Sequence, residues 1–167
     1  MSPVTRSSSL CILLLSLGTW GCGDPSEFPA LETCAVPQSN ALKISAHETS
    51  FVPLTDDSEI EVTQGFQGGY HVYAALRLPV QPANPVLMSL NLCQGEKVVA
   101  RNRVDSDFVM ADTGFMSSRH LIYVLHDYRA GQLEDVPSRI AARLRDANGK
   151  IWETSIDVTT RCCQGAQ

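Results

Sequence analysis

The stretch AARLRDANGKIWETSIDV, residues 141–158, decides the fold class of this chain. Its second half alternates in a two-residue period, which places four side chains on one face: Trp152, Thr154, Ile156 and Val158. The pair Asn148 and Gly149 separates this run from the one before it, and such a pair supplies the positive φ angles of a tight hairpin. The stretch therefore predicts two antiparallel strands joined by a turn.

The run before this turn also fits a helix. Four apolar residues recur there at nearly helical spacing, and Gly149 would be a stop signal: Leu133, Val136, Ile140 and Leu144. The strand interpretation instead places Ile140, Ala142 and Leu144 on one face. We favour the strand, because the turn and the alternating run after it require an antiparallel partner.

Similar short runs, separated by turn residues, precede this hairpin: ALKISA (41–46), SEIEVTQ (58–64), YHVYAALRL (70–78), PVLMSLNLC (85–93) and HLIYVLH (120–126). In the second of them Ile60 and Val62 are expected to face inward, with Glu59 and Glu61 outward. No long helical pattern and no internal repeat interrupts the series. The pattern predicts an all-β domain over residues 41–163, a single immunoglobulin-like antiparallel β-sandwich of about seven to nine strands.

Residues 1–21 have the features of an export signal. MSPVTRSSS carries Arg6 and no acid, and the apolar stretch LCILLLSLGTW that follows has 11 residues, too few to span a bilayer. The Gly-Cys pair at its end resembles a bacterial lipoprotein processing site, with Cys22 as the lipidated residue, although Thr19 and Trp20 depart from the usual pattern. The alternative is ordinary signal peptidase cleavage after Gly23; we favour lipidation of Cys22.

The segment after the processing site differs in composition from the domain. Residues 22–40 are rich in proline and small polar residues, which predicts a tether between the membrane and the domain. Residues 164–167 are predicted to be a C-terminal tail. The whole chain has 13 Lys and Arg against 18 Asp and Glu, a formal net charge of −5, without a basic cluster. Nucleic acid is therefore excluded as a partner.

Four cysteines lie beyond the candidate lipid site: Cys34, Cys93, Cys162 and Cys163. In an exported protein they are expected to form two disulfides. A bond between the sequence neighbours Cys162 and Cys163 would strain the peptide between them. Of the three possible pairings we therefore favour those in which Cys34 and Cys93 each bond to one of the C-terminal pair. A zinc site is disfavoured, because Cys34 and Cys93 lack a second ligand at short spacing.

A family resemblance rests on four features: the GCGDP junction, the proline-rich segment, the run QGGYHVYAALRL and the late LRDANGKIWE hairpin. Together they resemble uncharacterised exported lipoproteins of Gram-negative bacteria. The resemblance covers about half of the chain at the level of motifs. It implies a β-sandwich on a lipid anchor, and it supplies no catalytic residue.

A possible ligand site lies on the strand that follows Gly69. There His71, Tyr73 and Arg77 are expected to share the outward face. We favour a structural role for His71, in which its ring hydrogen-bonds a neighbouring loop. The alternative is an exported enzyme or small-ligand-binding protein that uses these three residues.

Catalytic and metal signatures are missing from the sequence. The four histidines show no ligand spacing, no Gly-x-Ser-x-Gly elbow is present, and adjacent His126 and Asp127 would point to opposite faces of a strand. We therefore predict no enzyme activity, no catalytic residue and no cofactor. The prediction is a lipid-anchored protein of the cell envelope with a binding or structural role and an unidentified envelope partner. Gly23 after the lipid cysteine favours the outer membrane, with the domain facing the periplasm or the cell surface.

Overall fold

The structure is a computed structural model that describes residues 31–66 and 68–162. Ten strands make up the domain: β1 (Lys43–Ser45), β2 (Ser58–Gln64), β3 (Tyr70–Leu78), β4 (Val86–Gln94), β5 (Lys97–Ser106), β6 (Phe108–Ala111), β7 (Gly114–Ser117), β8 (His120–Val124), β9 (Val136–Arg145) and β10 (Ile151–Cys162). One short 3₁₀ turn, Ala130–Gln132, is the only helical element in this part of the chain, where no helix is long and apolar enough to cross a membrane. The all-β prediction is confirmed.

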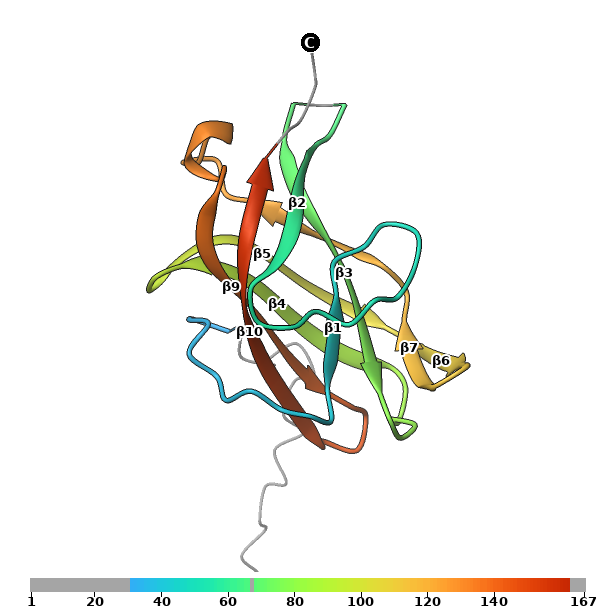
Figure 1. Ribbon diagram of the computed structural model, residues 1–167. Coiled ribbons are helices and arrows are strands. Elements are labelled where there is room, and N and C mark those ends of the chain that lie inside the picture. Colours follow the sequence, from blue (N-terminus) through green and yellow to red (C-terminus); the bar gives the residue numbers. More distant parts are fainter. Residues whose placement is uncertain (1–30, 67, 163–167) are drawn as a thin grey trace, which may run out of the picture.

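The strands form a closed ring of hydrogen-bonded ladders (Figure 1). The order β2-β10-β9-β4-β5-β8-β3 returns to β2 through a β2–β3 ladder. Outside the ring, β1 and β7 are attached to β3, and β6 is attached to β7. The ladders among β10, β9, β4 and β5 are long, whereas the β2–β3 and β5–β8 ladders each hold two residue pairs. The ring is therefore a flattened barrel, a β-sandwich whose two layers are joined at two narrow corners.

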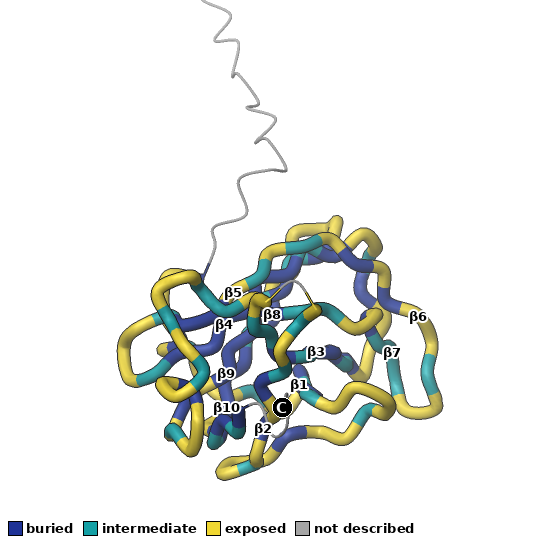
Figure 2. Tube along the Cα trace, turned by 90° about the horizontal axis from the view of Figure 1, so that it is seen from above, coloured by how far each residue is buried: buried dark blue, intermediate teal, exposed yellow. Residues whose placement is uncertain are grey.

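Alternation along the strands fills the space between the layers. Ile60 and Val62 point inward from β2 and Glu59 and Glu61 point outward, as the sequence predicts. β4 contributes four fully buried side chains to the same core: Val86, Met88, Leu90 and Leu92. Figure 2 shows these buried segments surrounded by exposed loops. Burial of this apolar surface supplies most of the stabilising free energy.

The β9–β10 hairpin confirms the strand interpretation of residues 136–145. Its ladder runs from Arg145 opposite Ile151 to Val136 opposite Thr160, so no helix forms there. The turn differs from the predicted tight one: it spans residues 146–150, and of its members Gly149 alone has a positive φ, +82°. The additional length is stabilised by Asp146, whose buried carboxylate accepts hydrogen bonds from backbone N–H groups.

Two features of the structure were not part of the predicted antiparallel sandwich of seven to nine strands. The first is a parallel ladder, in which Val158 to Cys162 of β10 pair with Ser58 to Val62 of β2. The second is the region 97–117, which forms β5, β6 and β7. A bulge at Leu92 and Cys93 shifts the β4–β5 register and interrupts the alternation that would reveal β5 in the sequence.

The β6–β7 hairpin depends on one glycine. Gly114 has a φ of +93°, and a Cβ atom added there would lie 2.3 Å from the carbonyl oxygen of Leu78. A side chain at this position would therefore clash with the β3 backbone, which the hairpin approaches through its Leu78 and Phe115 pair. Glycine is required both for the backbone conformation and for this contact.

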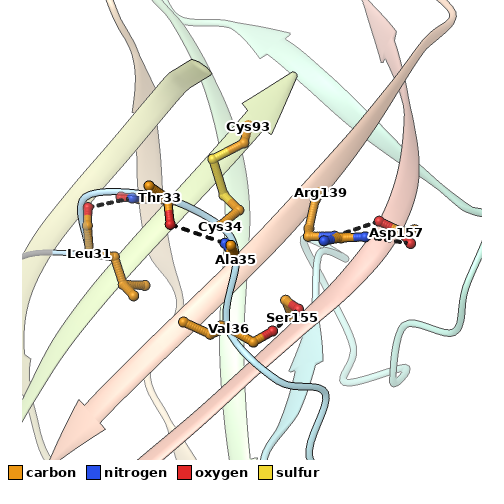
Figure 3. Close-up of a disulfide and its surroundings, with 10 residues drawn as sticks. Leu31, Thr33, Cys34, Ala35, Val36, Cys93, Arg139, Ser155 and Asp157 are labelled. Atoms are coloured by element: carbon orange, nitrogen blue, oxygen red, sulfur yellow. Dashed lines mark hydrogen bonds and ion pairs between the residues drawn. A yellow bond between two sulfur atoms is a disulfide. The ribbon is translucent and has the colours of Figure 1, made fainter. Parts of the chain in front are cut away.

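Residues 31–36 form a strap on the outer face of the barrel (Figure 3). The N–H of Leu31 donates to Ser89 Oγ at 2.9 Å, and Asn91 Nδ2 donates to the Leu31 carbonyl oxygen at 2.6 Å. Further along, Ser155 Oγ donates to the carbonyl oxygen of Val36 at 2.6 Å. This end of the predicted tether is therefore part of the folded domain, because its backbone polar groups find partners on β4 and β10.

A disulfide between Cys34 and Cys93 fastens the strap to β4. The predicted pairing of both residues with the C-terminal cysteines is wrong. Cys93 faces outward into a small apolar cluster with Leu31 and Cys34, whereas Cys162 belongs to the main core inside the barrel. The wall of the barrel separates them. Cys162 is also disulfide-bonded, and Cys163 and Cys22 lie outside the described residues.

Candidate functional site

The three candidate residues of β3 share its outward face, as predicted, but they do not form one site. Arg77 lies six positions beyond His71, about 20 Å along an extended strand. The Arg77 guanidinium lies 4.0 Å from the centre of the Phe51 ring and donates to Thr113 Oγ1 at 2.6 Å. Through these contacts Arg77 attaches the β1–β2 and β6–β7 connections to the barrel.

His71 is packed rather than hydrogen-bonded. Its ring meets the Tyr73 ring edge-on, with centroids 5.2 Å apart and an interplanar angle of 88°. On another side, a Cβ atom added at Gly65 would lie 3.7 Å from the imidazole ring. His71 Nε2 is buried without a hydrogen-bond partner among the described residues. The predicted hydrogen bond to a neighbouring loop is not formed by Nε2, and the contacts of His71 in the described chain are packing contacts.

This packing gives a first testable expectation, for His71→Phe. Phenylalanine keeps the edge-to-face contact and removes a buried polar atom that has no partner, so the free energy of unfolding should rise by about 1 kcal/mol. Denaturant unfolding of the purified chain measures it. The matched control is the exposed His126→Phe, which should leave stability unchanged. A loss of stability in His71→Phe would show that Nε2 has a polar partner.

A groove opens beside Tyr73, between the part of β3 that pairs with β2 and the part that pairs with β1. The β2 ladder ends at His71 and the β1 ladder begins at Ala75, so Val72, Tyr73 and Ala74 pair with neither of these strands. The opening has a volume of about 420 Å³. We call it the wall groove. Figure 1 shows that the β2–β3 hairpin and the end of β10 lie at the same end of the barrel, and both contribute to it.

Three segments line the wall groove together with Tyr73: residues 46–48 after β1, β2 itself and the end of β10. Their members are Ala46, His47, Glu48, Glu59, Ile60, Glu61, Thr63, Arg161 and Cys162. The sequence pattern identified Tyr73 as a candidate and placed Glu59 and Glu61 on the outside. The contributions of His47, Glu48 and Arg161 depend on long-range contacts that no local pattern reveals.

The charged groups of the wall groove are unevenly paired. Arg161 Nη2 donates to Glu59 Oε1 at 2.6 Å, and Arg161 also forms an ion pair with Asp135 outside the groove. The hydrogen bond and positive charge of Arg161 hold the pKa of the Glu59 carboxyl below its ordinary value, so Glu59 is ionised at neutral pH. Glu48 and Glu61 are exposed and form no ion pair within the described part of the chain.

A cluster of Ser106, Ser118 and His120 is the nearest approach to a nucleophile and base. His120 Nε2 lies 3.1 Å from Ser106 Oγ and 3.2 Å from Ser118 Oγ. Burial lowers the pKa of His120, which favours the neutral imidazole. No carboxylate among the described residues hydrogen-bonds His120, so the third member of a catalytic triad is missing there.

Metal binding has no support within residues 31–66 and 68–162. No group of three or more His, Cys, Asp or Glu side chains is placed there to hold a metal ion. A second hollow, of about 310 Å³, lies over β4 and β5 beside the strap, lined by Ser89, Asn91, Arg101, Asn102 and Arg103. Ser89 and Asn91 already bond to the backbone of Leu31, so this hollow belongs to the strap junction.

Comparison with known proteins gives matches to solved structures alone. No protein-family model matches the chain, and no curated protein matches it. Among solved structures, CopC from Methylosinus trichosporium OB3b is similar at 12% sequence identity and a TM-score of 0.38. The match covers 68% of this chain and 91% of that one.

Proposed function

We propose that the protein is an exported, lipid-anchored binding module of the bacterial cell envelope. The disulfide between Cys34 and Cys93 carries this proposal, because such bonds form and persist in oxidising compartments outside the cytoplasm. The bond closes the strap onto the barrel at the point where the chain arrives from its N-terminal segment. A binding role is favoured over catalysis, because no carboxylate of the described chain hydrogen-bonds His120 in the Ser106–Ser118–His120 cluster.

The strap shortens the expected tether. Leu31 is already buried against β4, so the chain between the candidate lipid site Cys22 and the domain is residues 22–30. A chain of this length reaches about 30 Å at most when fully extended. A domain anchored at Cys22 would therefore stay close to the membrane and would bind partners there.

The anchor is tested by Cys22→Ser. Without a thiol to carry the lipid, the chain should leave the membrane fraction and partition into the aqueous phase of a detergent extraction. Intact mass measurement of the native protein should show the acyl chains on Cys22. A native chain that begins at Asp24 without lipid would refute the anchor and support ordinary signal peptidase cleavage.

Small-ligand binding at the wall groove is the second candidate function. Tyr73, which the sequence identified together with His71, lines this groove, and its volume of about 420 Å³ lies within the range of ligand sites. Arg77 is excluded from it by its contacts with Phe51 and Thr113. The candidate site is therefore Tyr73 with residues 46–48, β2 and the end of β10, in place of the trio on β3.

A further inference from the structure

We propose that the wall groove binds an organic cation, a ligand of the primary-amine class. The inference rests on the proposed binding function and names its ligand chemistry. It is carried by the position of the groove in the barrel, by the excess of carboxylates in it and by the aromatic ring of Tyr73.

The groove is a fixed consequence of the strand arrangement. Because β1 and β2 both pair with β3, at opposite ends of it, their backbones diverge beside Tyr73. On its far side β2 is held by the parallel ladder to β10, and the ladder from Ser58 to Val62 includes the stretch that carries Glu59 and Glu61. The two glutamates therefore project from a stretch of β2 that is paired with β10 on one side, and β2 is joined to β3 just beyond it, at Thr63 and Gln64.

Charge selects a cation for this site. Glu48, Glu59 and Glu61 line the groove with one cationic side chain, Arg161. That guanidinium is engaged by Glu59 and by Asp135, so it offers little charge to an anionic ligand. Glu48 and Glu61 remain as carboxylates without a protein cation in the described chain. An ammonium group bound in the groove would supply the missing counter-charge.

Tyr73 distinguishes an organic cation from a metal ion. An alkylammonium gains from contact with the face of an aromatic ring and also buries its carbon chain against it. The T-shaped contact between the two rings packs His71 against Tyr73 and makes His71 a positioning residue. Metal binding would instead need a tight cluster of ligand atoms, and the described residues contain no such group.

The test is a calorimetric titration of the purified full chain with spermidine at low ionic strength. Saturable binding is expected, with an affinity that falls as salt is added because the carboxylates are exposed. Glu61→Gln should weaken it about tenfold, since the substitution removes one counter-charge at nearly constant shape. The matched control is Glu96→Gln, an exposed glutamate in the turn between β4 and β5, which should keep the wild-type affinity.

Substitutions of Tyr73 test the aromatic contact separately. Tyr73→Phe keeps the ring and should bind spermidine as the wild type does, whereas Tyr73→Leu should weaken binding about threefold to tenfold. Circular dichroism of each variant checks that the barrel is intact. An absence of saturable binding, an equal loss in Glu61→Gln and Glu96→Gln, or calcium binding at the groove in place of spermidine would overturn the proposal. Membrane anchoring through Cys22 is measured independently, so either proposal can fail without the other.

Discussion

Replacing Cys34 and Cys93 together by alanine is expected to lower the free energy of unfolding by about 4 kcal/mol. The bond joins residues 59 apart in sequence, and a cross-link over a loop of that length removes much of the conformational entropy of the unfolded chain. The double substitution avoids leaving a lone buried thiol. Urea denaturation of the variant and the wild type measures the difference.

A control separates this bond from the other disulfide. Reductant added to the double variant should produce only the loss that comes from Cys162, which is also disulfide-bonded. Hydrogen exchange gives a local measurement: the amide of Leu31, bonded to Ser89 Oγ, should lose protection when the strap is released. Unchanged stability together with an unchanged Leu31 amide would show that the strap is held by its hydrogen bonds and apolar contacts alone.

The strands that could be predicted from the sequence are those with one buried face and one exposed face. β2 is buried on its inner face and exposed on its outer face, so Ile60 and Val62 alternate visibly with Glu59 and Glu61. The second half of β10 follows the same rule, with Val158 and Thr160 buried and Asp157 exposed. In such strands the two-residue period records the inside and the outside of the barrel directly.

Features that depend on distant contacts were not predictable in this way. The outer face of β4 is covered by the strap, so Asn91 and Cys93 are buried although they lie opposite the core side chains. From the sequence alone Cys93 could meet any other cysteine of the chain. Its pairing with Cys34 follows from the docking of residues 31–36, which is a tertiary contact and leaves no local pattern.

The candidate site was predictable only in part for the same reason. The alternation of β3 places His71, Tyr73 and Arg77 on one face, but it does not show which strands lie beside each of them. Because β3 pairs first with β2 and then with β1, Tyr73 faces a groove while Arg77 lies against Phe51. Ladder order, rather than strand pattern, therefore decides which of the three residues a ligand can reach.

Asp146→Ala is expected to destabilise the barrel by about 3 kcal/mol. The Asp146 carboxylate accepts hydrogen bonds from the N–H groups of Asn148, Lys150 and Ala83, at 3.0, 2.9 and 3.2 Å. It thereby holds the β9–β10 turn and ties that turn to the β3–β4 connection, and charge-assisted bonds of this kind exceed neutral ones in strength.

Thermal unfolding measures the loss of stability. The matched control is Asp112→Ala, at an exposed residue of the β6–β7 turn, whose stability should stay within about 0.5 kcal/mol of the wild type. Asp146→Asn retains a single acceptor oxygen, so its loss of stability should lie between those of Asp146→Ala and Asp112→Ala. If Asp146→Ala loses no more stability than the control, solvent replaces the carboxylate and strand pairing alone closes this end of the barrel.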